Sequence, residues 1–190
     1  SFTRKAGEEL RRRVEEEVGV ELGHVGTIHG FCLETLWDAG RVVWPLDAVE
    51  LALVVEHVAA EVRLRSADLK AVAAEVARDR KSKRPLAGAD SALLVSVRDY
   101  MVRNRLLWVG DLLWLWSWCF DRGEAVADVA RARARMLLWD EVQDSSEEEW
   151  GVVERLDPDD LVVVGDQRQS IYQWRGSVPR RLDAFVAEEH

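Results

Sequence analysis

The sequence has few cysteines and no long apolar run, and each shortage excludes a class of protein. Among its 190 residues the cysteines are Cys32 and Cys119, too few for a disulfide framework or a cysteine zinc site. The richest apolar stretch, LLWLWSWCF at 112–120, is far shorter than the roughly 20 residues that cross a membrane. No segment resembles a signal peptide. We therefore expect a cytoplasmic protein without a membrane partner.

The sequence also lacks an excess of basic side chains. Its 26 Lys and Arg residues face 35 Asp and Glu residues, which gives a formal net charge of −9 and argues against a uniformly basic surface. The charge is uneven, however, because basic residues crowd the segments 4–13 and 81–84, whereas 140–150 is acidic. Local basic patches are enough to hold one nucleic-acid strand in a groove, so the net charge decides little.

The order of apolar patterns predicts an α/β chain with a helical middle part. Apolar residues recur at helical spacing from 10 to 18 and again after Gly26. Between about 45 and 130 the predicted helices lie near 51–62, 68–80, 91–107, 111–120 and 124–133. From 136 onward the pattern changes to strand, helix, strand and helix, which is typical of an α/β layer.

Two short apolar runs end abruptly in carboxylates and amides. The first is LLWDEVQD at 137–144 and the second is VVVGDQRQSIYQWRG at 162–176. Such a run is typical of a buried strand that presents polar groups at its C-terminal tip. Two of these strands, joined by a short helix, would bring four side chains within reach of one ligand: Asp140, Glu141, Gln143 and Gln169.

A second interpretation of Asp140 and Glu141 stays open at this point. An acidic turn at this place would cap the helix that follows it. A Ser at 145 or 146 together with a Glu at 148 or 149 is indeed typical of a helix cap.

The pair DE followed by QD, and then GDxxQSIYxWRG, resembles motifs II and III of the UvrD/Rep/PcrA helicases of superfamily 1. Three further segments resemble this family: SFTRKA at 1–6 (motif Ia, TFTNKA), TIHGFC at 27–32 (T-x-H-S-F) and VGDLL at 109–113 (DFDDLL). The sequence departs from the family at Arg4, Gly30 and Val142, where Asn, Ser and Phe are usual. The resemblance covers nearly the whole chain, strongly at both ends and weakly across 40–105.

The resemblance implies a partial RecA-like P-loop NTPase motor subdomain, 1A, interrupted by a mostly helical subdomain, 1B. We expect 1A to comprise residues 1–40, with motif Ia and the TxHxF motif, and 131–190, with motifs II and III. The 1B-like insertion would comprise 41–130. The chain contains no GxxxxGK[ST] sequence, the loop that cradles nucleotide phosphates. We therefore interpret it as a fragment of a longer helicase that is inactive as an ATPase by itself.

The resemblance also implies ATP and Mg²⁺ as cofactors. Mg²⁺ takes one or two carboxylates and keeps several waters, so Asp140 is expected to bind the metal. Glu141 would accept a proton from the attacking water as a general base. Gln143 and Gln169 carry amides that both donate and accept, which suits them to sense the γ-phosphate. Arg175 would contact either DNA or the nucleotide.

Four other residues are candidates for binding DNA alongside Arg175. Trp174 is expected to stack on a base, as the resemblance implies, and the alternative for it is a core position. Phe2 is a second candidate for stacking. Thr27 and His29 resemble phosphate-contacting residues at a helix N-terminus, which favours an anion. The alternative for His29 is a structural hydrogen bond.

The predicted function is that of an ATP-dependent DNA helicase, which couples ATP hydrolysis to movement on single-stranded DNA and to unwinding of a duplex. The expected partners are single-stranded DNA, junctions of single- and double-stranded DNA, and the remaining domains of the helicase. Two alternatives stay open. One is a non-catalytic, helicase-like module that binds DNA, and the other is the motor part of a RecB/AddA-like helicase–nuclease.

Replacing Trp174 with Ala distinguishes stacking on DNA from core packing. If the indole stacks on a base, Trp174→Ala in the full-length protein weakens binding of single-stranded DNA by about 1–3 kcal/mol, while the Tm barely moves. The salt dependence of binding stays unchanged, because a stacked base releases no counterions. Thermal melts beside DNA titrations at two salt concentrations measure both effects. A large fall in Tm with unchanged affinity per folded molecule would reject the stacking role, because truncating a core Trp costs about 3–5 kcal/mol of stability.

Overall fold

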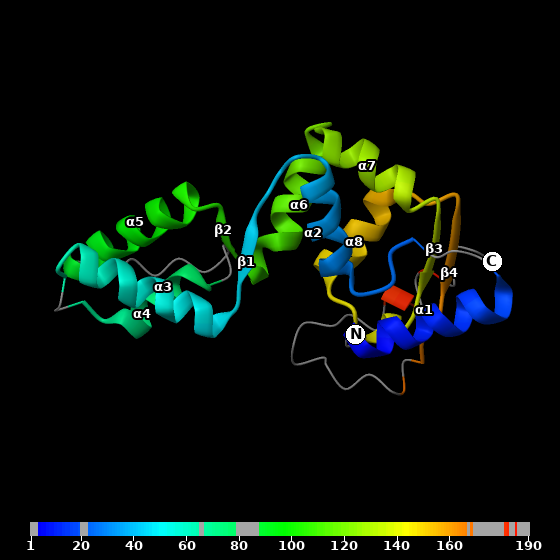
Figure 1. Cartoon of the computed structure of the whole chain (residues 1–190), viewed down its shortest axis with the longest axis horizontal. Coiled ribbons are helices and arrows are strands. Elements are labelled where there is room, and N and C mark those ends of the chain that lie inside the picture. Colours follow the sequence, from blue (N-terminus) through cyan, green and yellow to red (C-terminus); the bar gives the residue numbers. More distant parts are fainter. Residues whose placement is uncertain are drawn as a thin grey trace. The chain divides into compact units, whose positions relative to one another are not determined.

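The chain divides into two compact units, each described here by itself. A computed structural model describes residues 4–19, 23–64, 67–78, 88–166, 168, 181–182 and 185. The first unit comprises Ser1–Gly40 and Leu113–His190, and the second comprises Arg41–Leu112 (Figure 1). Helices combine with two small parallel sheets, as expected for an α/β protein. No helix within the described ranges has the length and apolar character needed to cross a membrane.

The first unit contains a parallel pair of strands joined by a helix. Strand β3 (Met136–Trp139) pairs with β4 (Asp160–Val163) in register, with Met136 opposite Asp160 and Trp139 opposite Val163. The connection consists of the 3-10 turn η2 (Val142–Asp144) and helix α8 (Glu147–Leu156). Figure 1 shows the two strands side by side with α8 close to them. Parallel strands need such a crossover, because a two-residue hairpin cannot join them.

Alternation along both strands separates a packed face from an open one. Trp139 and Val142 form a buried cluster with Trp150 and Val153 of α8. Leu137, Leu161 and Val163 pack against this cluster, as does Ile28 from the start of another helix. On the opposite face Met136 is 72% exposed and Leu138 is 64% exposed. The cluster supports the strand ends, since Val142 belongs to it and Val163 packs against it.

Helices α1 (Arg4–Val18), α2 (Ile28–Asp38), α6 (Leu112–Asp121) and α7 (Ala125–Arg133) also belong to or enter the first unit. Helix α2 packs against α7. Helix α6 is joined to α2 by a buried hydrogen bond, in which Trp116 Nε1 donates to Thr35 Oγ1 at 2.9 Å. Both side chains are fully buried. Such a pair fixes α6 because a buried indole N–H is costly without an acceptor.

The second unit is mostly helical. Helices α3 (Ala48–Glu61), α4 (Leu69–Val76) and α5 (Gly88–Arg103) surround a core of buried aliphatic side chains. Helix α3 begins with a capping box in which the side chains of Asp47 and Glu50 each bond the other residue's backbone N–H. The unit also contains a short parallel pair, β1 (Trp44–Leu46) with β2 (Leu106–Trp108), followed by the 3-10 turn η1 (Val109–Asp111).

Two features of this unit differ from the sequence-based expectation. Residues 106–107 were expected at the end of a helix, but α5 ends at Arg103 and these residues pair with β1. The 1B-like insertion was expected to comprise 41–130; helices do continue to Arg133, but the compact unit comprises only Arg41–Leu112. The physical reason is that α6 and α7 have their buried partners on α2, which belongs to the first unit.

The hydrogen bond between Trp116 and Thr35 predicts a measurable loss of stability. Thr35→Val keeps the shape of the side chain but removes the acceptor, which leaves the buried indole N–H unpaired. We expect the free energy of unfolding to fall by about 1–3 kcal/mol, measured by urea denaturation. Ser96→Ala is the matched control, because it removes an exposed bond from a side chain to Ala92 O and should change stability by less than about 0.5 kcal/mol. Equal losses in the two variants would contradict this account.

Candidate functional site

The segments that follow β3 and β4 stay side by side beyond the strands. The backbone N–H of Val164 donates to the carbonyl of Trp139 at 2.8 Å, and the N–H of Val142 donates to the carbonyl of Val164 at 3.2 Å. Residues 140–143 therefore lie next to residues 164–166. This is the carboxyl end of a parallel pair, the edge at which α/β proteins commonly bind ligands.

The amide of Gln143 joins the two segments. Its Nε2 donates to Oε2 of Glu141 at 2.6 Å, and its Oε1 accepts from the backbone N–H of Asp166 at 3.1 Å. The side chain is only 1% exposed. A Cβ at Gly165 would lie 2.5 Å from Gln143 Oε1, so a side chain at this position would displace the Gln143 amide from its bond with Asp166. Gln143 thus orients the Glu141 carboxylate and fixes the Gly165 segment with one group.

Asp140 and Glu141 form the accessible part of this site. Glu141 adopts a left-handed backbone conformation with φ of 55°, which is uncommon for a residue with a Cβ and costs about 1–3 kcal/mol. Its N–H donates to Oδ1 of Asp140 at 2.9 Å. Asp140 is half-buried and Glu141 is exposed. The turn therefore presents two adjacent carboxylates at the strand end, one fixed by Gln143 and one by the backbone.

The cap of α8 is formed by other residues. Ser146 Oγ accepts the N–H of Glu149, and Glu149 Oε2 accepts the N–H of Ser146, which completes a capping box. Of the pairs that the sequence allowed, the cap is thus Ser146 with Glu149. Asp140 and Glu141 are not needed to cap this helix, so the helix-cap interpretation of these two carboxylates is wrong.

The oxygen-rich strand end is compatible with Mg²⁺, which prefers carboxylates and water. Oδ1 of Asp140 receives the Glu141 N–H, which leaves the second oxygen, Oδ2, for another ligand. Within the described ranges no three His, Cys, Asp or Glu residues are grouped so as to hold a metal. A metal at this edge would be held by one or two carboxylates, with water completing its coordination.

Thr27 and His29 lie at the N-terminus of α2. Thr27 is the N-cap, and its Oγ1 accepts the N–H of Gly30 at 3.0 Å. His29 is 41% exposed at its side chain, and its Nδ1 lies 3.7 Å from Oε1 of Glu149 in the first turn of α8. Ile28, between them in the chain, packs against the buried cluster beneath β3. The start of α2 and the strand end thus rest on the same core.

Cys32, one turn further along α2, is not a reactive group. Burial, and to a smaller extent the Glu149 carboxylate, raises the pKa of its thiol well above the ordinary value. The thiol therefore stays protonated at neutral pH and is a poor nucleophile.

Comparison with known proteins identifies the family. The model of the UvrD/REP helicase N-terminal domain matches residues 46–189, more than half of the chain. The chain belongs to the UvrD/REP helicase N-terminal domain family.

Relatives of this UvrD/REP domain include proteins named ATP-dependent DNA helicase PcrA. The protein from Bacillus subtilis is 26% identical over 200 residues, which cover 93% of this chain and 27% of the relative. Those from Staphylococcus aureus and Staphylococcus epidermidis are each 26% identical over 208 residues, which cover 97% of this chain and 28% of the relative. The chain thus spans just over a quarter of the length of the curated relatives it matches.

The structure brings together only part of the site predicted for this UvrD/REP domain. Asp140, Glu141 and Gln143 share one edge, and Thr27 and His29 share one helix end. The remaining predicted residues lie outside the described residues: Phe2, Gln169, Trp174 and Arg175.

Two features of this edge were not expected from the sequence of the UvrD/REP domain. The backbone N–H of Asp166 bonds Gln143, and Gly165 lies close to the Gln143 side chain. The dipeptide GD directly after an apolar run was the available signal, since glycine at a strand end often marks a close approach of backbone.

The close contact at Gly165 predicts that a larger residue at this position lowers the stability of the protein. A methyl group in Gly165→Ala would displace the Gln143 amide and break its bond with the Asp166 N–H. We expect the free energy of unfolding to fall by about 1–3 kcal/mol, measured by denaturant titration. Gly23→Ala is the control, because no heavy atom lies within 4 Å of a Cβ at Gly23. If both variants were as stable as the parent, the contact between Gly165 and Gln143 would not constrain the site.

Proposed function

We propose that this chain is part of an ATP-dependent DNA helicase and supplies the segments that activate water and relay the state of the nucleotide. The single observation that carries the proposal is the Gln143 amide, which holds Glu141 on one side and the Asp166 backbone on the other. Membership of the UvrD/REP family and the names of the relatives support it. The first unit would then be the RecA-like subdomain 1A, and the second would correspond to the helical subdomain 1B.

The roles at the strand end follow from the chemistry of phosphoryl transfer. Bound ATP with Mg²⁺ supplies a γ-phosphoryl group for transfer to water. Asp140 would bind the metal through the carboxylate oxygen that the Glu141 N–H leaves open. Glu141 would accept the proton of the water, in an orientation that the Gln143 hydrogen bond holds. Enzymes of this kind act mainly by positioning and by neutralising charge.

Gln143 also suggests how the strand end communicates with the segment that continues from β4. A shift of the Glu141 carboxylate would move the Gln143 amide and strain the hydrogen bond that its Oε1 accepts from the Asp166 N–H. That segment continues to Gln169, proposed to sense the γ-phosphate, and to Trp174 and Arg175, proposed to contact DNA.

DNA would contact the first unit at a second place as well. Thr27 and His29 would bind a phosphate of single-stranded DNA at the start of α2, and Phe2 would stack on a base. Junctions of single- and double-stranded DNA and the remaining helicase domains are the other proposed partners.

The proposed roles of the two carboxylates predict different effects. In the full-length helicase, Glu141→Gln should keep nucleotide binding and lower the turnover of ATP by about 10²–10⁴-fold, because the general base is removed. Asp140→Asn should instead weaken the Mg²⁺-dependent part of nucleotide binding. Steady-state ATPase assays and nucleotide titrations with and without Mg²⁺ measure the two effects.

Glu148→Gln serves as the control for both variants. Glu148 is an exposed glutamate in the first turn of α8, so its loss should leave turnover and binding unchanged. Hydrolysis by Glu141→Gln at the parent rate would refute the role given to this residue.

A further inference from the structure

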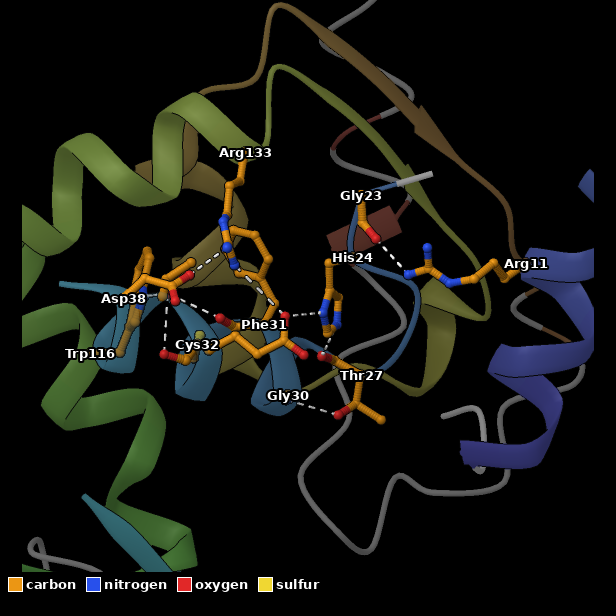
Figure 2. A network of polar contacts seen from close by, with 12 residues as sticks. Arg11, Gly23, His24, Thr27, Gly30, Phe31, Cys32, Asp38, Trp116 and Arg133 are labelled. Atoms are coloured by element: carbon orange, nitrogen blue, oxygen red, sulfur yellow. Dashed lines mark hydrogen bonds and ion pairs between the residues drawn. The ribbon is translucent and has the colours of Figure 1, made fainter. Parts of the chain in front are cut away.

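The imidazole of His24 connects the start of α2 to the helix itself. Its Nε2 lies 3.2 Å from the carbonyl oxygen of Thr27, and its Nδ1 lies 3.0 Å from Oε2 of Glu34 (Figure 2). The side chain is 17% exposed. Both neighbouring atoms are acceptors, so the neutral imidazole donates to one of them and the doubly protonated ring donates to both. The ring thus crosslinks the N-cap residue to a side chain further along the helix.

Two glycines, Gly26 and Gly30, leave room for the His24 ring. A Cβ at Gly30 would lie 3.3 Å from Cε1 of His24, and a Cβ at Gly26 would lie 3.0 Å from its Nε2. The ring also meets Phe31 edge to face, with the centroids 5.7 Å apart. His24 therefore occupies space that a side chain at position 26 or 30 would need, and glycine at both positions permits the crosslink.

Glu34, at the other end of the crosslink, is contacted by a residue of α7. Nη1 of Arg133, the last residue of α7, lies 3.8 Å from Oε2 of Glu34, and its Nη2 pairs with Asp38. Figure 2 shows this chain of contacts running from Arg133 through the α2 side chains to His24. Oε2 of Glu34 thus contacts both the Arg133 guanidinium and the His24 imidazole.

The crosslink ends on the residue that starts the helix. The Thr27 carbonyl accepts the N–H of Phe31 at 3.0 Å as well as the His24 contact. Its Oγ1 accepts the N–H of Gly30. The orientation of the Thr27 peptide therefore sets where the Thr27 hydroxyl and the first-turn N–H groups point. Those are the groups that an anion at a helix N-terminus would meet.

We propose that His24 is a positioning residue, which holds the Thr27 peptide so that Thr27 and His29 meet a phosphate of single-stranded DNA. This inference rests on the proposed function, in which the start of α2 contacts DNA. His24 acts through its Nε2 bond to Thr27, and the Nδ1 bond to Glu34 orients the ring.

Two substitutions separate the bonds of His24. The amide nitrogen of Gln reaches about as far as Nε2, whereas that of Asn reaches about as far as Nδ1. His24→Gln therefore restores the bond to Thr27, and His24→Asn restores only the bond to Glu34. His57→Ala is the matched control, because His57 is a half-exposed histidine of α3 that pairs with Glu61 in the second unit.

Binding of a fluorescent oligothymidylate to the 190-residue chain, expressed per folded molecule, is the test. We expect His24→Ala and His24→Asn to weaken binding by about fivefold, the effect of one ordinary hydrogen bond. His24→Gln and His57→Ala should bind like the parent chain. In a Thr27→Ala/His29→Ala background, His24→Ala should cause no further loss, because a positioning residue acts through the groups that it positions.

The outcomes separate this inference from the function on which it rests. If Thr27→Ala/His29→Ala binds as tightly as the parent chain, the start of α2 is not a DNA site and both proposals fail there. If that variant is weakened while His24→Ala and His24→Asn are not, the DNA site stands and the role of His24 is overturned. An equal loss from His24→Ala in both backgrounds also overturns it, because His24 would then act elsewhere.

Discussion

The two hydrogen bonds of the Gln143 side chain are the constraint on which the candidate site depends. A buried amide is stable only when its donor and acceptor are both paired, and Gln143 finds one partner after each strand. The carboxylates themselves cannot define the site, since Glu141 is exposed and its backbone conformation is unfavourable. The amide compensates for this by fixing the Glu141 carboxylate. The neutral amide of Gln143 thus sets the orientation of the charged Glu141 carboxylate.

The second constraint is the apolar cluster beneath the strand ends. Val142 and Trp139 belong to it, and Ile28 packs against it from the start of α2. The residues that follow β3 and the start of α2 are therefore neighbours on one packed core, although they are far apart in the sequence. Close packing transmits displacement because protein interiors are dense and resist compression. This arrangement gives a physical basis for coupling between the two proposed binding regions.

Two departures from the usual family sequence have a structural explanation. Val142 stands where Phe is usual, and its cluster contains two indoles, Trp139 and Trp150, whose centroids lie 4.7 Å apart. These indoles supply aromatic volume next to the smaller side chain. Gly30 stands where Ser is usual, and the imidazole of His24 approaches the place of the missing side chain.

The sequence by itself determined the elements whose cause is local. Helical spacing of apolar residues predicted the helix near 51–62, observed as Ala48–Glu61, and the Ser and Glu residues at 145–149 predicted the cap of α8. The apolar runs that end in carboxylates predicted β3 and β4 and the edge at which Asp140, Glu141 and Gln143 meet. These features depend on side chains within a few residues of one another, so their pattern is visible in the sequence.

Only the tertiary structure decided the features that depend on distant partners. Residues 106–108 form a strand because they pair with Trp44–Leu46, and the second unit ends at Leu112 because Trp116 donates to Thr35. The bond between Gln143 and Asp166, 23 positions apart, and the contact between His24 and Glu34, 10 positions apart, likewise arise from the folding of the chain. Hydrogen-bond partners that are brought together by folding leave no periodic pattern along the chain, and for this reason local spacing predicts the helices but not these bonds.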